Sequence, residues 1–166
     1  MIEFIDATEQ DLPLIRHLAE QTFHGTYLPL QPKEKVDYLF NLMYNPSSLA
    51  EQMKNGQRFI IAKDETSYLG YASYEINCKK VGTTKIHKIY VLPTAQGKGV
   101  GRQLINIIAA IGLNNKNQTL ALNVYRKNPA IDFYQKMGFK IAEEVNIDVG
   151  NGFVMNDYVM EKNIGD

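Results

Sequence analysis

Six consecutive residues, Gln96-Gly97-Lys98-Gly99-Val100-Gly101, constrain the fold of this chain more than any other segment. They follow an apolar run that predicts a strand at residues 86–92, and they precede a helical pattern at residues 102–113. Glycines at alternate positions let the backbone turn and approach a ligand closely. Because the next helix begins with unpaired N–H groups and the positive end of its dipole, this turn predicts a site for an anion such as a pyrophosphate.

Two other glycine-loop patterns do not fit this segment. A Walker loop requires Ser or Thr after Gly-Lys, whereas Gly99 follows Lys98. A Rossmann loop requires a third glycine where Arg102 stands, and an acid in the next strand, but residues 119–124 contain none. The pattern that fits is Gln-x-x-Gly-x-Gly, with Lys98 and Arg102 adding positive charge. Taken alone, the segment is also compatible with an ordinary glycine-rich turn.

A second segment, residues 128–139, predicts a short helix with both ends marked in the sequence. Asn128 is a favoured N-cap residue, and Pro129 suits the first helical position, where a missing N–H costs nothing. Gly138 predicts the left-handed residue that closes the helix.

Together these segments resemble two motifs of the GNAT family, the Gcn5-related N-acetyltransferases. The first follows the family's pyrophosphate loop, Gln/Arg-x-x-Gly-x-Gly/Ala. The second follows Asn-x-x-Ala-x-x-Phe-Tyr-x-x-x-Gly-Phe, with Ala130 one position earlier than in some relatives. Two motifs in the right order, about thirty residues apart, are more specific than either alone. Less distinctively, residues 20–27 and 153–162 resemble a bacterial subgroup that contains spermidine/spermine N-acetyltransferases.

The remaining sequence predicts an α/β (α+β) fold. Apolar and alternating runs predict strands at residues 2–5, 58–62, 68–76, 86–92, 120–124, 140–148 and 153–160. Helical periodicity predicts a first helix that is capped by Thr8 or Asp11 and ended by Gly25 and Pro29. It predicts further helices at residues 32–44, 48–55, 102–113 and 129–137. Gly150-Asn151-Gly152 predicts a hairpin turn. The resemblance implies a single GNAT-like domain over residues 1–166. Its mixed, mostly antiparallel sheet would have six or seven strands and helices on both faces.

Composition narrows the classes of partner and environment. Lysine plus arginine and aspartate plus glutamate number 18 each, so the net charge of zero favours neither a nucleic-acid nor a membrane partner. The sequence has no apolar run of membrane-spanning length and no signal peptide, so we expect a cytoplasmic protein. The single cysteine excludes an intramolecular disulfide framework. No spacing of His, Cys, Asp and Glu indicates a metal site, so we expect none.

The resemblance also implies acetyl-CoA, or coenzyme A, as the co-substrate. In the family, the strand before the loop pairs through its main chain with the pantetheine arm, and backbone N–H groups of the loop hold the pyrophosphate. Carried onto this sequence, the cofactor-binding residues are Ile89, Tyr90, Val91, Gln96, Gly97, Lys98, Gly99, Val100, Gly101, Arg102, Asn128 and Phe133.

Three residues are candidate proton-transfer groups. By its place in the motif, Tyr134 would be the general acid that protonates the leaving thiolate; the alternative is an ordinary buried tyrosine. His87 shares a strand face with Ile89 and Val91 and could accept a proton from the amine. Relatives often carry glutamate there, and a half-exposed structural histidine is the alternative. Glu75, on the neighbouring predicted strand, is a second candidate base.

The acceptor is expected to be a small primary amine such as a polyamine. Phe23, Tyr27 and Glu75 are candidate residues for contacting it, since aromatic faces and carboxylates attract cations. Two other functions stay open: a non-catalytic acyl-CoA-binding sensor or partner-binding module, and a protein or peptide N-acetyltransferase. The resemblance also allows a homodimer.

Overall fold

The computed structural model describes residues 1–165, which fall into two compact units. The first unit comprises Met1–Glu75 and His87–Ile107. The second comprises Ile76–Ile86 and the chain from Ile108 onward. Each unit is therefore built from two separate stretches of sequence. The single domain expected over residues 1–166 stays a prediction.

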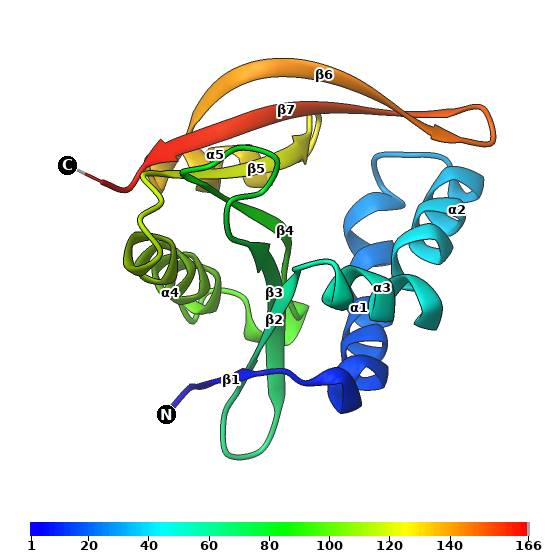
Figure 1. Cartoon of the computed structure of the whole chain (residues 1–166). Coiled ribbons are helices and arrows are strands. Elements are labelled where there is room, and N and C mark those ends of the chain that lie inside the picture. Colours follow the sequence, from blue (N-terminus) through cyan, green and yellow to red (C-terminus); the bar gives the residue numbers. More distant parts are fainter. Residues whose placement is uncertain (166) are drawn as a thin grey trace. The chain divides into compact units, whose positions relative to one another are not determined.

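The first unit combines a set of antiparallel strands with three complete helices, which lie on the same side of β2 and β3 in Figure 1, and with the part of a fourth helix, α4 (Val100–Asn114), that ends at Ile107. Its elements are β1 (Glu3–Asp6), α1 (Leu12–Tyr27), α2 (Lys33–Tyr44), α3 (Pro46–Lys54), β2 (Arg58–Lys63), β3 (Tyr68–Glu75) and β4 (Thr83–Val91) from His87 onward. Strand β2 pairs antiparallel with both β1 and β3. Four consecutive residues of β2 are buried, as expected for a strand with neighbours on both sides and both faces covered.

Helix α1 packs through an apolar stripe and is longer than the sequence predicts. Its buried residues recur every three or four positions, at Leu12, Ile15, Leu18, Ala19, Thr22 and Phe23. Gly25 does not end the helix, which continues to Tyr27. A Cβ at Gly25 would meet nothing within 4 Å, so no close approach requires a glycine here. Its cost to stability is limited to the low helix propensity of glycine, about 1 kcal/mol relative to alanine.

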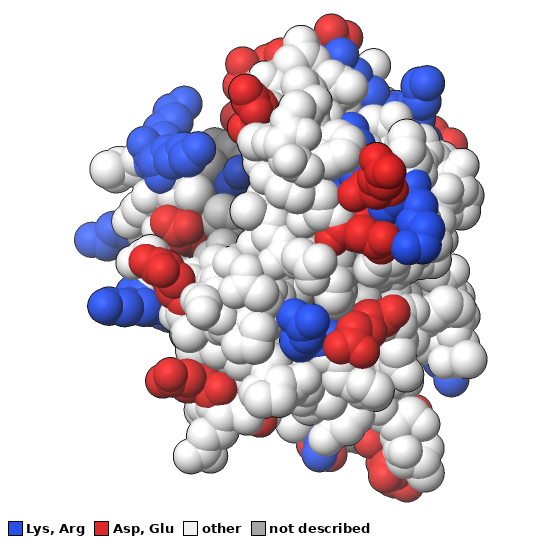
Figure 2. All heavy atoms as spheres, turned by 90° about the vertical axis from the view of Figure 1, so that its right-hand side faces the viewer, with Lys and Arg blue, Asp and Glu red and all other residues white. Residues whose placement is uncertain are grey.

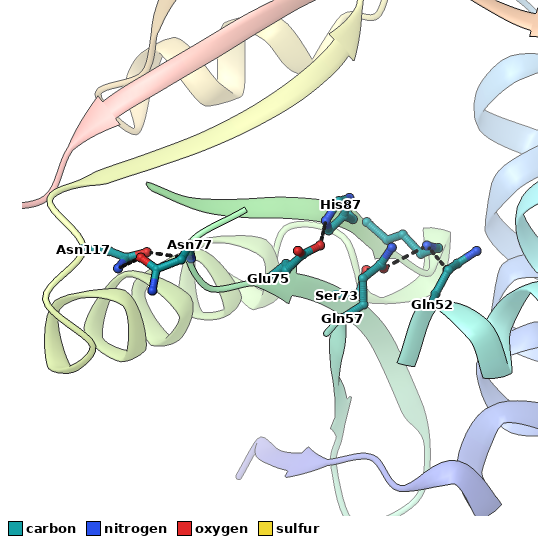
Figure 3. A network of polar contacts seen from close by, with 8 residues as sticks. Gln52, Gln57, Ser73, Glu75, Asn77, His87 and Asn117 are labelled. Atoms are coloured by element: carbon teal, nitrogen blue, oxygen red, sulfur yellow. Dashed lines mark hydrogen bonds and ion pairs between the residues drawn. The ribbon is translucent and has the colours of Figure 1, made fainter. Parts of the chain in front are cut away.

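The second unit holds the other strands and two helices. These are β4 up to Ile86, α4 (Val100–Asn114) from Ile108 onward, β5 (Thr119–Tyr125), α5 (Ala130–Lys136), β6 (Lys140–Gly150) and β7 (Phe153–Asn163). The first part of β4 pairs in parallel with β5, and β7 pairs antiparallel with both β5 and β6. Buried Asn117 donates to Oδ1 of Asn77 (2.8 Å; Figure 3). It also accepts from the Thr84 hydroxyl (2.7 Å), so it links the turn before β4 to β4 itself.

The hydrogen-bonded strand order over residues 1–165 is β1-β2-β3-β4-β5-β7-β6. This mixed, mostly antiparallel sheet confirms the predicted fold class. Boundaries shift by a few residues: β4 begins at Thr83 rather than residue 86, and α3 begins at Pro46 rather than residue 48. Asn45 accounts for the earlier start of α3, because its side chain caps the helix by accepting from the Ser48 N–H (2.9 Å).

The predicted hairpin between β6 and β7 is confirmed. Asn151 and Gly152 both have positive φ, 55° and 78°, as the two-residue turn with right-handed strand twist requires.

On the face shown in Figure 2, positive and negative side chains are interspersed among uncharged ones. Within residues 1–165, no helix combines the length and the apolar character needed to cross a bilayer.

Candidate active site

The glycine segment forms an exposed turn at the start of helix α4. Gly97 and Gly99 have φ values of +84° and +79°, a conformation that glycine adopts without steric cost. A Cβ at Gly97 would meet nothing within 4 Å, so the backbone is open on that side. Val100 is buried and anchors the first helical turn, where the Gln103 N–H donates to the Gly99 carbonyl (3.0 Å). The turn thus presents main chain at the positive end of a 15-residue helix.

Charges of both signs lie near this turn. Lys98 and Arg102 are exposed within it. Asp64, in the β2–β3 turn, accepts hydrogen bonds from the N–H groups of Thr66 (2.9 Å) and Ser67 (2.8 Å). These bonds lower the pKa of Asp64, and the positive charge of Lys98 lowers it further. The β2–β3 turn therefore contributes a carboxylate to the electrostatic surroundings of the glycine turn.

The second half of β4, which leads into the turn, is held very close to β3. A Cβ at Gly70 of β3 would lie 2.5 Å from the Tyr90 carbonyl oxygen and 3.1 Å from the Val91 Cα, so only glycine fits there. Gln96 reaches back to donate to the Val91 carbonyl (3.4 Å). We did not single out Gly70 from the sequence, although a lone glycine inside a predicted strand is a known signal of close backbone approach.

Two residues expected to contact the acceptor, Phe23 and Tyr27, belong to an aromatic cluster in the first unit. The Phe23 ring is 2% exposed and lies 4.7 Å from the Tyr27 ring and 6.2 Å from the Tyr90 ring. The Tyr27 hydroxyl is 2.9 Å from the Tyr90 hydroxyl. Burial raises the pKa of Tyr90 well above its ordinary value, so Tyr90 remains a neutral hydrogen-bonding group. Phe23 is thus a buried member of the cluster, whereas Tyr27 is partly exposed.

The two candidate bases are in contact with each other. Glu75 ends β3, His87 lies on β4, and Oε1 of the first is 3.0 Å from Nε2 of the second (Figure 3). Their side chains are 27% and 20% exposed, so neither is sealed in the core. The sequence placed both on neighbouring strands but did not predict the pair.

Lys88, the residue after His87, is buried without a carboxylate partner among its hydrogen bonds. Its Nζ donates to Oε1 of Gln52 (2.6 Å) and Oε1 of Gln57 (3.2 Å), two neutral amides. It also lies over the rings of Tyr44 (5.6 Å) and Phe59 (5.5 Å), which attract a cation. Burial lowers the pKa of Lys88 to about 7. Sequence reasoning missed this residue, because a lysine in a strand is ordinarily exposed.

In the second unit, the residues expected to act on the cofactor and the leaving group lie around α5. The Asn128 side chain accepts from the Ala130 N–H (2.9 Å). The predicted cap is nevertheless one residue early, because α5 begins at Ala130 and Pro129, not Asn128, is its N-cap residue. Tyr134 is 8% exposed, and its ring lies 5.5 Å from that of Phe133. Gly138 closes the helix with φ +96°, as predicted.

Comparison with known proteins places these features in a family. Residues 27–162 match the model of the acetyltransferase (GNAT) domain. Over 152 residues the chain is 26% identical to an uncharacterised N-acetyltransferase, YuaI, of Bacillus subtilis (strain 168); the match covers 90% of this chain and 86% of that protein.

Two solved structures of similar fold share less of the sequence. The PaiA N-acetyltransferase of Thermoplasma acidophilum, crystallised with coenzyme A, is 21% identical with a TM-score of 0.79, covering 98% of this chain and 99% of its own. Mutant forms of the spermidine/spermine N-acetyltransferase SpeG of Vibrio cholerae are 21% identical with a TM-score of 0.66, covering 99% and 95%. The family model spans most of this sequence, and the chain therefore belongs to the GNAT family of N-acetyltransferases, as its two motifs predicted.

Proposed function

We propose that this protein transfers the acetyl group of acetyl-CoA directly to a primary amine of a small molecule. Acetyl-CoA is the donor expected of a GNAT enzyme, and the PaiA N-acetyltransferase of similar fold was crystallised with coenzyme A. The observation that carries the proposal is the open glycine turn at the start of α4. Its backbone N–H groups and helix dipole suit the diphosphate of coenzyme A.

The donor would be held mainly by main chain. Residues 97–102 would bind the diphosphate, with Lys98 and Arg102 adding charge, and Gln96 would order the turn through its contact with Val91. The main chain of Ile89, Tyr90 and Val91 would pair with the pantetheine arm as an added strand does. Asn128 and Phe133 are part of the same proposal as further cofactor contacts.

The transfer needs one proton acceptor and one proton donor. The neutral amine attacks the thioester carbon and loses a proton to His87, the C–S bond breaks, and Tyr134 protonates the departing thiolate. A phenol has a pKa of ~10 and a thiol a pKa of ~8.5, so this last proton transfer is uphill in water by roughly 2 kcal/mol and depends on how the two groups are placed. The backbone N–H groups near Val91 would stabilise the oxyanion.

The proposed acceptor class is a small amine, and a polyamine is the first candidate. Tyr27, with Phe23 beneath it, offers aromatic surface to a cationic chain, and Glu75 offers a carboxylate. A spermidine/spermine N-acetyltransferase shares the fold, which supports a polyamine only by analogy. A cytoplasmic location, the absence of a bound metal and a homodimer belong to the proposal as expectations.

The test follows free thiol while the protein is mixed with acetyl-CoA and a panel of polyamines, other small amines and peptides. Acceptor-dependent thiol release is expected with at least one small amine. We expect Tyr134→Phe to lower turnover by roughly tenfold to a thousandfold with nearly unchanged affinity for coenzyme A. Gly99→Val should abolish measurable binding of coenzyme A, because a branched side chain would be strained at this φ and would occupy the space of the diphosphate.

Other outcomes of these assays would contradict the proposed function, the role of Tyr134 or the site of the diphosphate. Tight binding of coenzyme A without turnover on any acceptor would support the sensor instead. Release with peptides alone would support a protein N-acetyltransferase. Unchanged turnover in Tyr134→Phe would remove that tyrosine from its role, and wild-type binding by Gly99→Val would remove the diphosphate from this turn.

A further inference from the structure

Arg126, the residue after β5, extends across β7 and β6, which follow β5 in the pairing order of the second unit (Figure 1). Its guanidinium lies over the Tyr158 ring of β7, with Cζ 5.8 Å from the ring centroid. Its Nε donates to the Asp157 carbonyl of β7 (3.3 Å). Its Nη2 donates to the Val145 carbonyl (3.0 Å) and to Oδ1 of Asn146 (2.9 Å), both on β6. Contacts with two strands therefore fix the orientation of the guanidinium.

The positive charge of Arg126 is not neutralised by these contacts. Its three acceptors are two main-chain carbonyls and one side-chain amide, all of them uncharged. Glu144 faces Tyr158 across the β6–β7 ladder, yet within residues 1–165 no acid forms an ion pair with Arg126. Arginine also donates through Nη1, and the contacts above use only Nε and Nη2. Among the described residues, both N–H groups of Nη1 are therefore left for another acceptor.

We propose that Arg126 binds an anionic group, a carboxylate or a phosphate, of one of the two substrates. This inference rests on the proposed function, because it assigns the anion to a substrate of that reaction. A planar guanidinium matches the oxygens of carboxylates and phosphates. Since the Arg126 side chain is already ordered by its strand contacts, binding costs little further side-chain entropy. Arg126 is partly exposed, so an anion can reach it, and exposed Lys127 adds a second positive charge.

Either substrate of the proposed reaction can supply such a group. Coenzyme A carries a phosphate on its ribose besides the diphosphate assigned to the glycine turn, and Asn128, two residues after Arg126, is among the proposed contacts of the donor. An acceptor such as an amino acid carries a carboxylate next to its amine. A polyamine carries no anionic group. If the anion belongs to the acceptor, the acceptor is therefore an amino acid or a similar amine rather than a polyamine.

The first experiment observes the arginine itself and needs no turnover. The Nε–H signal of Arg126 in proton–nitrogen NMR spectra, assigned by its loss in Arg126→Lys, is followed while inorganic phosphate is added at constant ionic strength. We expect a saturable shift of this signal. Asn146→Asp keeps an oxygen for Nη2 but supplies a counter-charge, so phosphate should bind roughly twofold to fivefold more weakly. Asn41→Asp, the same change at an exposed position of α2, is the matched control and should bind phosphate like the wild-type protein.

The second experiment identifies the substrate that carries the anion. Calorimetry compares coenzyme A with dephospho-coenzyme A, which lacks the ribose phosphate. If the donor supplies the anion, Arg126→Gln should weaken binding of coenzyme A by about tenfold and leave dephospho-coenzyme A unchanged. If the acceptor supplies it, the variant should raise the KM for an amino acid by about tenfold but not the KM for its decarboxylated amine. Lys127→Gln removes an equal charge without strand contacts and should change either value by at most about twofold.

The outcomes separate this inference from the function on which it rests. If the wild-type protein releases no thiol with any amine, the proposed function fails, whereas the phosphate titration and the two forms of coenzyme A still test the anion site. If the protein is active but the Arg126 signal does not respond to phosphate, the anion site is overturned. It is also overturned if Arg126→Gln affects both forms of coenzyme A equally and the amino acid and its decarboxylated amine equally.

Discussion

His87 and Lys88 are neighbours on β4, yet their surroundings are opposite. The imidazole of His87 is partly exposed and meets a carboxylate, Glu75, at 3.0 Å. The ammonium of Lys88 is 6% exposed and meets two neutral amides and two aromatic faces. Successive side chains of a strand point to opposite faces, so these two neighbours lie in a partly solvent-exposed charged site and in the buried core, respectively.

The two environments favour opposite charge states of these side chains. A carboxylate beside an imidazole favours the charged ring, which a proton acceptor needs. Burial beside neutral partners disfavours the charged lysine, so its pKa falls to about 7. We therefore expect His87 to matter for turnover and Lys88 to matter for stability.

The largest expected effect is a pH-dependent change in stability from Lys88→Met. The lysine pKa is 10.5 ordinarily and about 7 in the folded protein, so between these values the unfolded chain binds one more proton. The unfolding free energy of the wild-type protein should therefore rise with pH, relative to Lys88→Met, by about 1.4 kcal/mol per unit. Below about pH 7 both states are protonated and the difference should level off.

Urea unfolding at several pH values measures this trend. Lys54→Met, at an exposed position of α3, is the matched control. A stability difference between Lys88→Met and the wild-type protein that stays constant from about pH 7 to about pH 10 would show that Lys88 is not desolvated as its contacts indicate.

A smaller effect on stability is expected from Gly70→Ala, which tests whether the close approach of β3 to β4, the strand that carries His87 and Lys88, is needed. The new Cβ would lie 2.5 Å from the Tyr90 carbonyl oxygen, so β4 must shift. We expect a loss of about 1 to 3 kcal/mol in unfolding free energy and weaker binding of coenzyme A.

Gly25→Ala is the matched control for that substitution. Gly25 lies inside α1 with nothing within 4 Å of the new Cβ, so this change should stabilise the protein by about 0.5 to 1 kcal/mol. Thermal unfolding and calorimetric titration of coenzyme A measure both effects. Equal stability of the two variants would contradict the close approach at Gly70.

The smallest effect is expected at Asp64, whose carboxylate lies in the electrostatic surroundings of Lys98. Asp64→Asn keeps an oxygen for the Thr66 and Ser67 N–H groups but removes a negative charge near the glycine turn. We expect coenzyme A to bind about twofold to fivefold more tightly at low salt. In about 1 M salt, where charges are screened beyond about 3 Å, the difference should vanish. Weaker binding at low salt would contradict this view of Asp64.

The sequence predicted elements wherever local signals were strong. The glycine turn, the short α5 closed by Gly138, and the Asn151-Gly152 hairpin all rest on local backbone preferences. It failed at Gly25, where burial of the α1 stripe outweighs the propensity cost of one glycine.

From the sequence alone, periodicity predicted the fold class and the glycine positions predicted the loop proposed to bind the diphosphate, because both signals lie within a few residues of each other. The family was predicted by the resemblance of two motifs to those of GNAT enzymes. Three features depend on the folded chain: Glu75 meets His87, Lys88 is buried beside two amides, and position 70 accepts only glycine. Each of these depends on the register between segments distant in sequence. Contact, desolvation and close approach arise only once the chain has packed, so local pattern cannot specify them.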